Sequence, residues 1–276
     1  MLNQSEICRL LKTIVNLSIQ GDINFRHLSQ GITNESYWLV IDDKEYVLKI
    51  HNPDTDRLGL NRENEIQILT FLKPFDLCPE TIFYSPEHNF TLSHWLPGKI
   101  WHNQELQHPP ALLQLAQKLK QLHGMPCDNL PEIDLLKRLQ HYRMMIQKRH
   151  GKLPGTELKV LTSAHKLLAS LQQILPSCLC HNDLISANIL SNNQNLYFLD
   201  WEYAAVNNPL FELAVITQGN QLSETNQQYF LEQYFGDKKA FFDNNYAVYC
   251  WFYQYLSLLW TLVIIPKENP LPENLD

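Results

Sequence analysis

The chain has 276 residues, of which 45% are hydrophobic and 18% are charged, and it contains 12 phenylalanines, 12 tyrosines and 6 tryptophans. This composition excludes a disordered, collagen-like or low-complexity chain and predicts a globular protein with a sizeable core. The formal net charge of -7 gives no overall positive field, so we expect no nucleic acid partner. A basic run between Lys137 and Lys152 fits a solvated helix face, and we assign it no function.

The six cysteines are expected to be free thiols. The N-terminal residues lack the charged start and apolar run of a secretory signal, which predicts a reducing, cytoplasmic compartment. Cys178 and Cys180 are one residue apart, and no second Cys or His pair follows at zinc-ligand spacing. Packing within a strand is therefore favoured over a structural metal, and none is predicted.

The first part of the chain reads as strands and turns around one helix. Residues that favour strands lie between turn residues at 23–28, 37–41, 46–50, 81–84 and 90–95. Apolar residues spaced as on a helix face predict a helix over 61–72, which Pro74 ends. The pair Pro97-Gly98 marks a connector, so residues 1–97 are predicted to form a small lobe.

Beyond this connector the pattern is mostly helical. Leu112, Leu115 and Leu119 lie on one stripe, which is typical of an amphipathic helix. Helices are predicted at 111–123, 133–149 and 157–175, and a strand-rich insert at 177–200. Residues 98–276 are therefore predicted to form a larger, α-rich lobe.

Residues 247–265 are long and apolar enough to span a membrane. However, Tyr249, Trp251, Tyr253 and Tyr255 lie through the first half of this stretch rather than at both ends, as an interfacial belt would require. A buried helix and no membrane partner are therefore expected, with a membrane anchor as the alternative.

Four polar residues in the strand-rich insert have a spacing that suggests chemistry. A short hairpin between Asn188 and Asp200 would bring these two side chains together as hard oxygen ligands of the kind that Mg²⁺ accepts beside nucleotide phosphates. Asp183 would lie at the rim of the same site and orient a hydroxyl nucleophile. Taken singly, these could be ordinary turn residues and His181 a core histidine, but their joint spacing matches the catalytic loop and metal-binding aspartate of kinases.

Together with the segment from Leu199 to Ala204, these residues resemble the aminoglycoside phosphotransferase and choline kinase superfamily. The order Asp-Trp-Glu-Tyr from Asp200 to Tyr203, in place of Asp-Phe-Gly, is similar to the choline, ethanolamine and thiamine kinase branch. The resemblance implies an α+β, protein-kinase-like bilobal fold, with a small β-rich N-terminal lobe containing one helix. It also implies a kinase that uses ATP and Mg²⁺ on a small-molecule hydroxyl, with His181 packing and positioning the catalytic loop.

The first lobe contains residues that could hold the nucleotide. Lys49 lies within an apolar strand, where a cation is costly unless it is paired. It could therefore serve as the lysine that holds the α- and β-phosphates in kinases. An edge-strand lysine that reaches solvent is the alternative. Glu65 on the following helix shares a face with Leu69 and is similar in position to the glutamate of the family, so we assign it as the partner of Lys49, with Glu63 as the alternative.

The turn between the first two predicted strands is a candidate phosphate loop, although its single glycine is weak evidence by itself. By resemblance to the family, the phosphate-side candidates are Gly31, Asn34 and Ser36. Resemblance alone assigns the strand containing Ser93 and Trp95 as the hinge whose backbone meets adenine.

Substrate choice is expected to depend on aromatic faces and acidic groups in the second lobe, because aromatic rings bind organic cations. The candidates are Glu202, Tyr203, Glu212 and Trp260, and most other aromatic residues are expected to be core. In choline kinases, to which this segment is similar, a second tryptophan follows three residues after the first, whereas here Val263 occupies that position. The acidic residue that choline kinases tend to carry seven positions past the equivalent of Glu212 corresponds to Gly219.

Choline or ethanolamine is therefore the first predicted substrate, followed by thiamine and then an aminoglycoside-type antibiotic. The alternatives outside enzymes are an inactive kinase-like binding module and a membrane-anchored scaffold.

Overall fold

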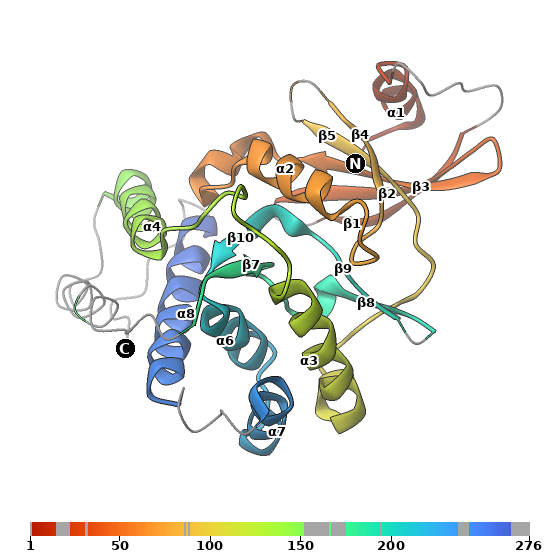
Figure 1. Ribbon diagram of the computed structural model, residues 1–276. Helices are drawn as coiled ribbons and strands as arrows, with labels where there is room; N and C mark the ends of the chain where they lie inside the picture. The colour runs from red at the N-terminus through yellow and green to blue at the C-terminus, as the bar shows by residue number, and fades with distance from the viewer. Residues whose placement is uncertain are drawn as a thin grey trace.

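A computed structural model of the chain describes residues 2–14, 23–30, 33–85, 87, 89–151, 166, 175–193, 195–236 and 243–265. Figure 1 shows the strands of the first part at one end of the molecule and the helices of the second part at the other. The predicted helix at 157–175 lies almost entirely outside the described residues, so nothing is said of it.

The first lobe is an antiparallel five-stranded sheet with the order β1-β2-β3-β5-β4. Alternate residues of its strands, such as Tyr37, Leu39 and Leu48, are buried in a small core. Turn residues at positive φ, Asp42 and Asp43, connect β2 to β3. The strands are β1 (Asn24–Gln30), β2 (Asn34–Ile41), β3 (Lys44–His51), β4 (Thr81–Tyr84) and β5 (Phe90–His94).

Two helices belong to this part of the chain. Helix α1 (Gln4–Leu11) was not predicted; the side chains of Asn3 and Glu6 cap its first turn, and Ile7 and Leu11 enter the small core. Helix α2 (Arg62–Leu72) begins after Asn61, whose side chain accepts hydrogen bonds from the first turn. The apolar side of α2 is buried in the core of the second lobe, which fixes this helix at the seam between the lobes.

The chain crosses between the lobes at a close approach of two backbones. Strand β6 (Lys99–Ile100) pairs with β8 (Ile189–Asn192) directly after Gly98. A Cβ at Gly98 would lie 2.7 Å from the carbonyl oxygen of Ser191 and would also collide with Cδ2 of Leu190. Only glycine therefore fits the connector at this point.

The second lobe is built of helices around two small sheets. Strand β8 pairs with β9 (Asn195–Phe198), and β7 (Cys178–Cys180) pairs with β10 (Ala205–Asn207). One large core lies beneath them and joins the helices of this lobe to α2. The helices are α3 (Pro109–His123), α4 (Leu135–His150), α6 (Pro209–Gly219), α7 (Glu224–Phe235) and α8 (Asp243–Ile264).

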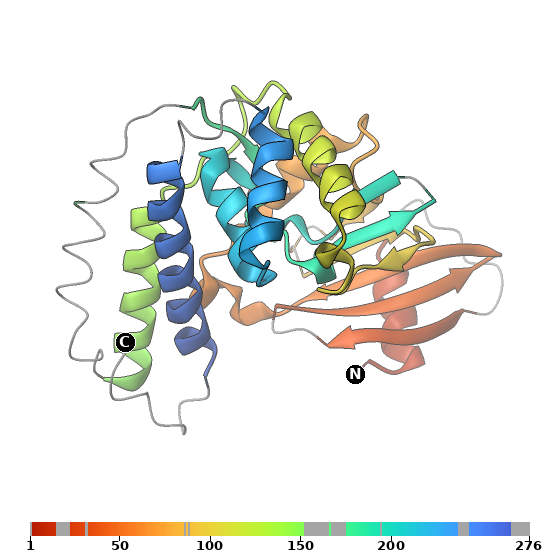
Figure 2. The same cartoon turned by 90° about the horizontal axis from the view of Figure 1, so that it is seen from below.

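Helix α8 contains most of the apolar stretch for which a membrane anchor was the alternative. Among the described residues, one segment, Asn245–Ile264, is long and apolar enough to cross a membrane by length and composition. In the structure α8 packs against α4 and α6, and Figure 2 shows it lying alongside α4. Tyr249, Phe252, Tyr255 and Leu259 recur every three to four residues and are buried, so this side of α8 belongs to the core.

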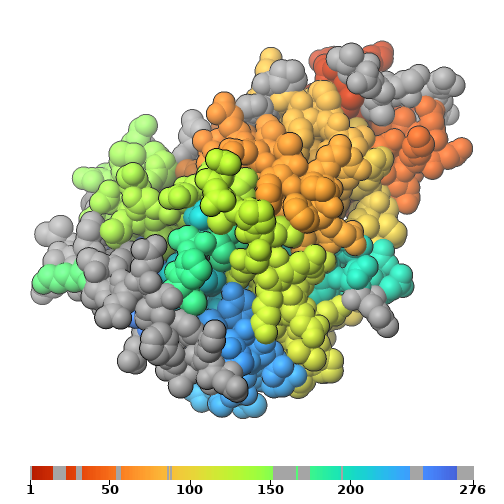
Figure 3. Space-filling view, viewed as in Figure 1, coloured from red at the N-terminus to blue at the C-terminus, as the bar shows by residue number. Residues whose placement is uncertain are grey.

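The two lobes give the α+β bilobal arrangement that the sequence predicts. Figure 3 shows the strand-rich first part packed directly on the helical second part. The larger core contains Leu58, Ile68 and Leu77 from the first part of the chain. The lobes therefore share packing across the seam where the polar site residues gather.

Candidate active site

Lys49 joins the two lobes at the seam. Strand β3 carries it, and its ammonium nitrogen lies 3.3 Å from Oε1 of Glu65 and 2.7 Å from Oδ1 of Asp200. Burial lowers the pKa of Lys49, but the charges of Asp200 and Glu65 outweigh this and raise it. The lysine is therefore a fixed cation at the point where a phosphate could enter.

A second ionic network lies beside this pair and was not predicted. Arg62 lies 2.6 Å from Oε2 of Glu65 and 3.0 Å from Oε2 of Glu202, and it donates to Oδ1 of Asn34 over 3.1 Å. The amide of Asn34 also donates to Glu202 over 2.8 Å. Glu202 therefore lies at the pocket, as expected, but its carboxylate accepts hydrogen bonds from Arg62 and Asn34. The side chain of Asn34, a predicted phosphate contact, forms hydrogen bonds within this network instead.

The catalytic loop follows β7 and brings Asp183 to Asn188. Asn182 adopts a φ of 64°, in the left-handed region that asparagine tolerates better than most residues, and this turn precedes Asp183. The amide nitrogen of Asn188 donates to the backbone oxygen of Asp183 over 2.8 Å and to its Oδ2 over 3.0 Å. Burial, together with the charges of Asp200 and Glu202, raises the pKa of Asp183 well above its usual value.

Two buried side chains hold this loop from below. His181 donates from Nε2 to the carbonyl oxygen of Leu199 over 2.8 Å, which ties the loop to the segment that ends in Asp200. Burial lowers the pKa of His181, so the ring is neutral and acts as a positioning group. Glu212 was predicted to contact substrate, but it is fully buried outside the pocket, where it accepts from the backbone nitrogen of Asn182 over 2.8 Å and contacts His123.

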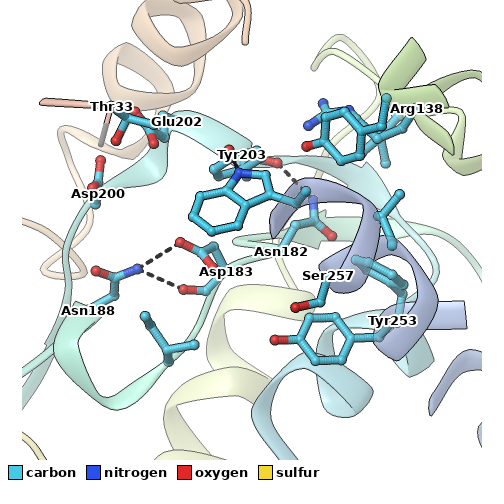
Figure 4. Close-up of a pocket in the computed structure, with 16 residues that line it drawn as sticks. Thr33, Arg138, Asn182, Asp183, Asn188, Asp200, Glu202, Tyr203, Tyr253 and Ser257 are labelled. Atoms are coloured by element: carbon cyan, nitrogen blue, oxygen red, sulfur yellow. Dashed lines mark hydrogen bonds between the residues drawn. The ribbon is translucent and has the colours of Figure 1, made fainter. Parts of the chain in front are cut away.

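The loop opens into a pocket with a volume of about 340 Å³. Figure 4 shows Asp183 and Asn188 side by side, with Asp200 and Glu202 along the same side of the pocket. Tyr203 and Trp260 both line it, and the indole nitrogen of Trp260 donates to the Tyr203 hydroxyl over 2.9 Å. The other aromatic residues in its wall are Tyr142, Phe211 and Tyr253.

The two departures from choline kinases have structural counterparts. Val263 is buried in the core and is not among the residues that line the pocket. A Cβ at Gly219 would lie 2.6 Å from the hydroxyl of Tyr253, so the tyrosine occupies the space beside this glycine. The hydroxyl of Tyr253, which lines the pocket, therefore fills the space beside Gly219.

The nucleotide-side candidates are only partly described. Gly31 lies outside the described residues. Ser36 faces Lys49 in the β2–β3 register, so it lies on the strand next to the lysine. The Ser93 hydroxyl is 3.0 Å from that of Thr81, and the backbone nitrogen of Trp95 donates to the backbone oxygen of Glu45, so both lie where β5 leads into the connector.

The residues at the pocket fit a hard divalent cation. The amide nitrogen of Asn188 is used twice on Asp183, which leaves its oxygen Oδ1 as the ligand atom, and Asp200 uses Oδ1 on Lys49 and retains Oδ2. Carboxylate and amide oxygens are the ligands that Mg²⁺ prefers. Elsewhere, the structure brings the ligand atoms of His123, Cys178 and Cys180 within 4.8 Å of one another, a grouping that their sequence spacing did not indicate. His123 is hydrogen bonded to Glu212, and Cys180 to the backbone oxygen of Asn207.

Several residues of the site, among them Arg62, Arg138 and Tyr142, were not predicted from the sequence. Arg62 precedes Glu65 by three residues on a helix, a spacing at which ion pairs form, and this signal could have suggested it. Arg138 and Tyr142 are four residues apart on α4, and their basic and aromatic types gave no sign that this side of the helix meets a pocket.

Comparisons with known proteins give a family match and several similar structures. The sequence pattern of the phosphotransferase enzyme family (APH) matches residues 24–251. A Protein LicA homolog of Metamycoplasma hominis is 29% identical over 210 residues, which are 76% of this chain and 78% of that protein. The crystal structure of choline kinase LicA from Streptococcus pneumoniae is similar with a TM-score of 0.81 and 19% identity, covering 98% of this chain and 93% of that one.

A second similar structure, Plasmodium vivax ethanolamine kinase, has a TM-score of 0.76 and 18% identity and covers 91% of this chain and 78% of that one. These similarities confirm the predicted kinase-like fold.

Proposed function

Because the chain belongs to the phosphotransferase enzyme family, we propose that it transfers the γ-phosphate of ATP to the hydroxyl of a small amino alcohol. The observation that carries this proposal is the convergence of Asp183, Asn188 and Asp200 on one pocket, with Lys49 paired to both Glu65 and Asp200. An inactive binding module would have no need for a partly buried aspartate at this place.

Asp183 is the proposed catalytic base. Its raised pKa makes the carboxylate a stronger base than an exposed aspartate, and Asn188 fixes its orientation. The substrate oxygen forms a bond to the γ-phosphorus while the bond from that phosphorus to the β-phosphate oxygen breaks. The hydroxyl proton goes to Asp183, and ADP leaves.

The nucleotide side of the proposal rests on Lys49, Asn188 and Asp200. Lys49 would hold the α- and β-phosphates, and Glu65 keeps its ammonium group in position. Asn188 and Asp200 would hold Mg²⁺, which supplies charge stabilisation to the transferred phosphoryl group when it is bound. Ser36 and the backbone near Ser93 and Trp95 remain our candidates for contacts with phosphate and adenine.

Choline or ethanolamine is the first proposed substrate, thiamine the second, and an aminoglycoside-type antibiotic the third. Solved structures named as a choline kinase and an ethanolamine kinase share this fold, and the pocket offers Trp260 and Tyr253 as aromatic faces. Since ATP is available in the cytoplasm, we propose that the protein acts there.

The test is an ADP-release assay of purified protein with ATP, Mg²⁺ and each of choline, ethanolamine, thiamine and kanamycin. We expect turnover on an amino alcohol, and Asp183→Ala should lower kcat by roughly 100- to 10,000-fold, the usual contribution of a general base. Asp128→Ala is the matched control, because Asp128 is exposed and outside the pocket. Nucleotide binding without turnover on any alcohol would identify a binding module instead.

A further inference from the structure

The proposed substrate pocket contains a cation of its own. Arg138, on α4, lines the pocket, and its guanidinium carbon lies 5.4 Å from the centre of the Tyr203 ring. At this distance the guanidinium interacts with the face of the ring. Arg138 therefore takes a position that an organic cation would need if it were to bind on Tyr203.

The charge of Arg138 is not neutralised by the carboxylates around it. Within the described part of the chain, no carboxylate forms a salt bridge with Arg138, and the acidic side chains that line the pocket, like that of Asp134, have other partners. Asp183 accepts from Asn188, Asp200 pairs with Lys49, Glu202 pairs with Arg62, and Asp134 lies 3.5 Å from the ammonium of Lys137. An arginine without an acidic partner in a pocket wall is available to an acidic ligand.

Arg138 also lies at an opening rather than in packed core. Together with Glu202 and Tyr203 it lines a neighbouring cavity, also of about 340 Å³, that adjoins the pocket. Its side chain is neither fully buried nor held by an ion pair.

The charges divide the pocket into two ends. In Figure 4, Asn188 and Asp200 lie on one side, Arg138 lies on the opposite side, and Asp183 lies between them. An ammonium group is favoured near the carboxylate of Asp183, whereas Arg138 repels it and favours an anion. A substrate with a single positive charge matches only one of these ends.

We propose that the acceptor is an amino alcohol that also carries an acidic group, and that Arg138 binds this group while the hydroxyl faces Asp183. This inference rests on the proposed kinase function and, within its class of amino alcohols, ranks acid-bearing acceptors ahead of choline and ethanolamine. Arg138 is then a specificity residue, because its bidentate fork suits a carboxylate and disfavours simple cations such as choline.

The experiment compares substrate pairs that differ by one carboxylate: ethanolamine with L-serine, and 3-aminopropan-1-ol with L-homoserine. The wild-type protein should show the higher kcat/KM for the carboxylate-bearing member of a pair. Arg138→Gln should raise the KM of that member by roughly 10- to 150-fold, the effect of losing a hydrogen bond to a charged group, with little change in kcat. It should also lower the KM of the simple amino alcohol.

Lys137→Gln is the matched control, because Lys137 is the adjacent cation on α4, is 82% exposed and does not line the pocket. It should leave the preference unchanged, and Arg138→Lys should keep part of it. If the wild type prefers the simple amino alcohols and Arg138→Gln does not change the ratio, the inference is wrong and the kinase proposal stands. If no amino alcohol of either kind is phosphorylated, the kinase proposal fails and the inference fails with it.

Discussion

At the level of single residues, Glu65 is a carboxylate of the seam that forms ion pairs with two cations. It is almost fully buried and contacts two cations, Lys49 and Arg62. Burial raises the pKa of Glu65, but these two cations outweigh burial and lower it to about 2. Glu65 is therefore an anion at any pH at which the protein is expected to work, and it fixes both cations.

Glu65→Gln should lower kcat/KM by roughly 10- to 150-fold, because it removes hydrogen bonds from two charged groups to a charged acceptor. Glu63→Gln, on the exposed side of the same helix, should leave kcat/KM within about 2-fold, the range of a surface change of under 0.5 kcal/mol. The measurement is steady-state ADP release at varied ATP. Equal losses in the two variants would mean that the identity of the glutamate does not matter.

Much of the site was predictable at this level, and the reason for the rest is physical. The spacing of His181, Asp183 and Asn188 is local, so the sequence alone indicates how they lie together. Arg62 contacts Glu202 from 140 residues away, and Arg138 meets Tyr203 only through the packing of α4, so neither contact leaves a local pattern. Glu212 was predicted to be free to bind substrate, because a backbone N–H, such as that of Asn182, leaves no mark in the sequence as a partner.

At the level of elements, α8 contributes both to the core and to the pocket. Phe252 faces the core and is completely buried, whereas Tyr253 and Trp260 line the pocket on another side of the helix. An apolar stretch long enough to cross a membrane therefore carries core residues on one side and pocket residues on another. Neither side favours charged residues, which explains the low charge of α8.

Phe252→Ala should lower the free energy of unfolding by about 3 to 5 kcal/mol, the usual cost of a cavity left by a buried phenylalanine. Thr261→Ala on the same helix is the control, because Thr261 is exposed and bonds only to its own helix at Ser257. Urea unfolding followed by far-UV circular dichroism measures both. A loss below 1 kcal/mol for Phe252→Ala would show that this face of α8 is not core.

Strands and amphipathic helices were predicted best, because alternation and a repeat of three to four residues mark one buried face. Helix α6 was not predicted as an element, since nine of its residues from Pro209 to Thr217 are buried and no polar face marks its period. Helix α1 is only eight residues long, and its capping residues, Asn3 and Glu6, were its main signal.

At the level of the whole molecule, a buried histidine links stability to pH. His123 lies 2.7 Å from Oε2 of Glu212 and also contacts the hydroxyl of Tyr234. Burial lowers the pKa of His123, but the hydrogen bond and charge of Glu212 outweigh it and raise the pKa above 6.5. Because the folded pKa exceeds the unfolded one, this pair stabilises the fold fully below pH 6.5.

The stabilisation should be lost as pH rises through the raised pKa of His123. The measurement is the free energy of unfolding in urea for the wild type and His123→Gln at several pH values from slightly acidic to alkaline. The difference between the two proteins should be largest at the acidic end and shrink as pH increases. A difference that stays constant or grows with pH would contradict the assignment of a charged His123.

The packing of α2 has a consequence for how the chain can be divided. The covalent connector lies at Gly98, yet Ile68 and Leu72 belong to the core of the second lobe. A fragment that started after the connector would lack these side chains, and its own apolar groups would face water. The second lobe is therefore not an autonomous folding unit, and swapping lobes between relatives would require α2 to travel with the helical half.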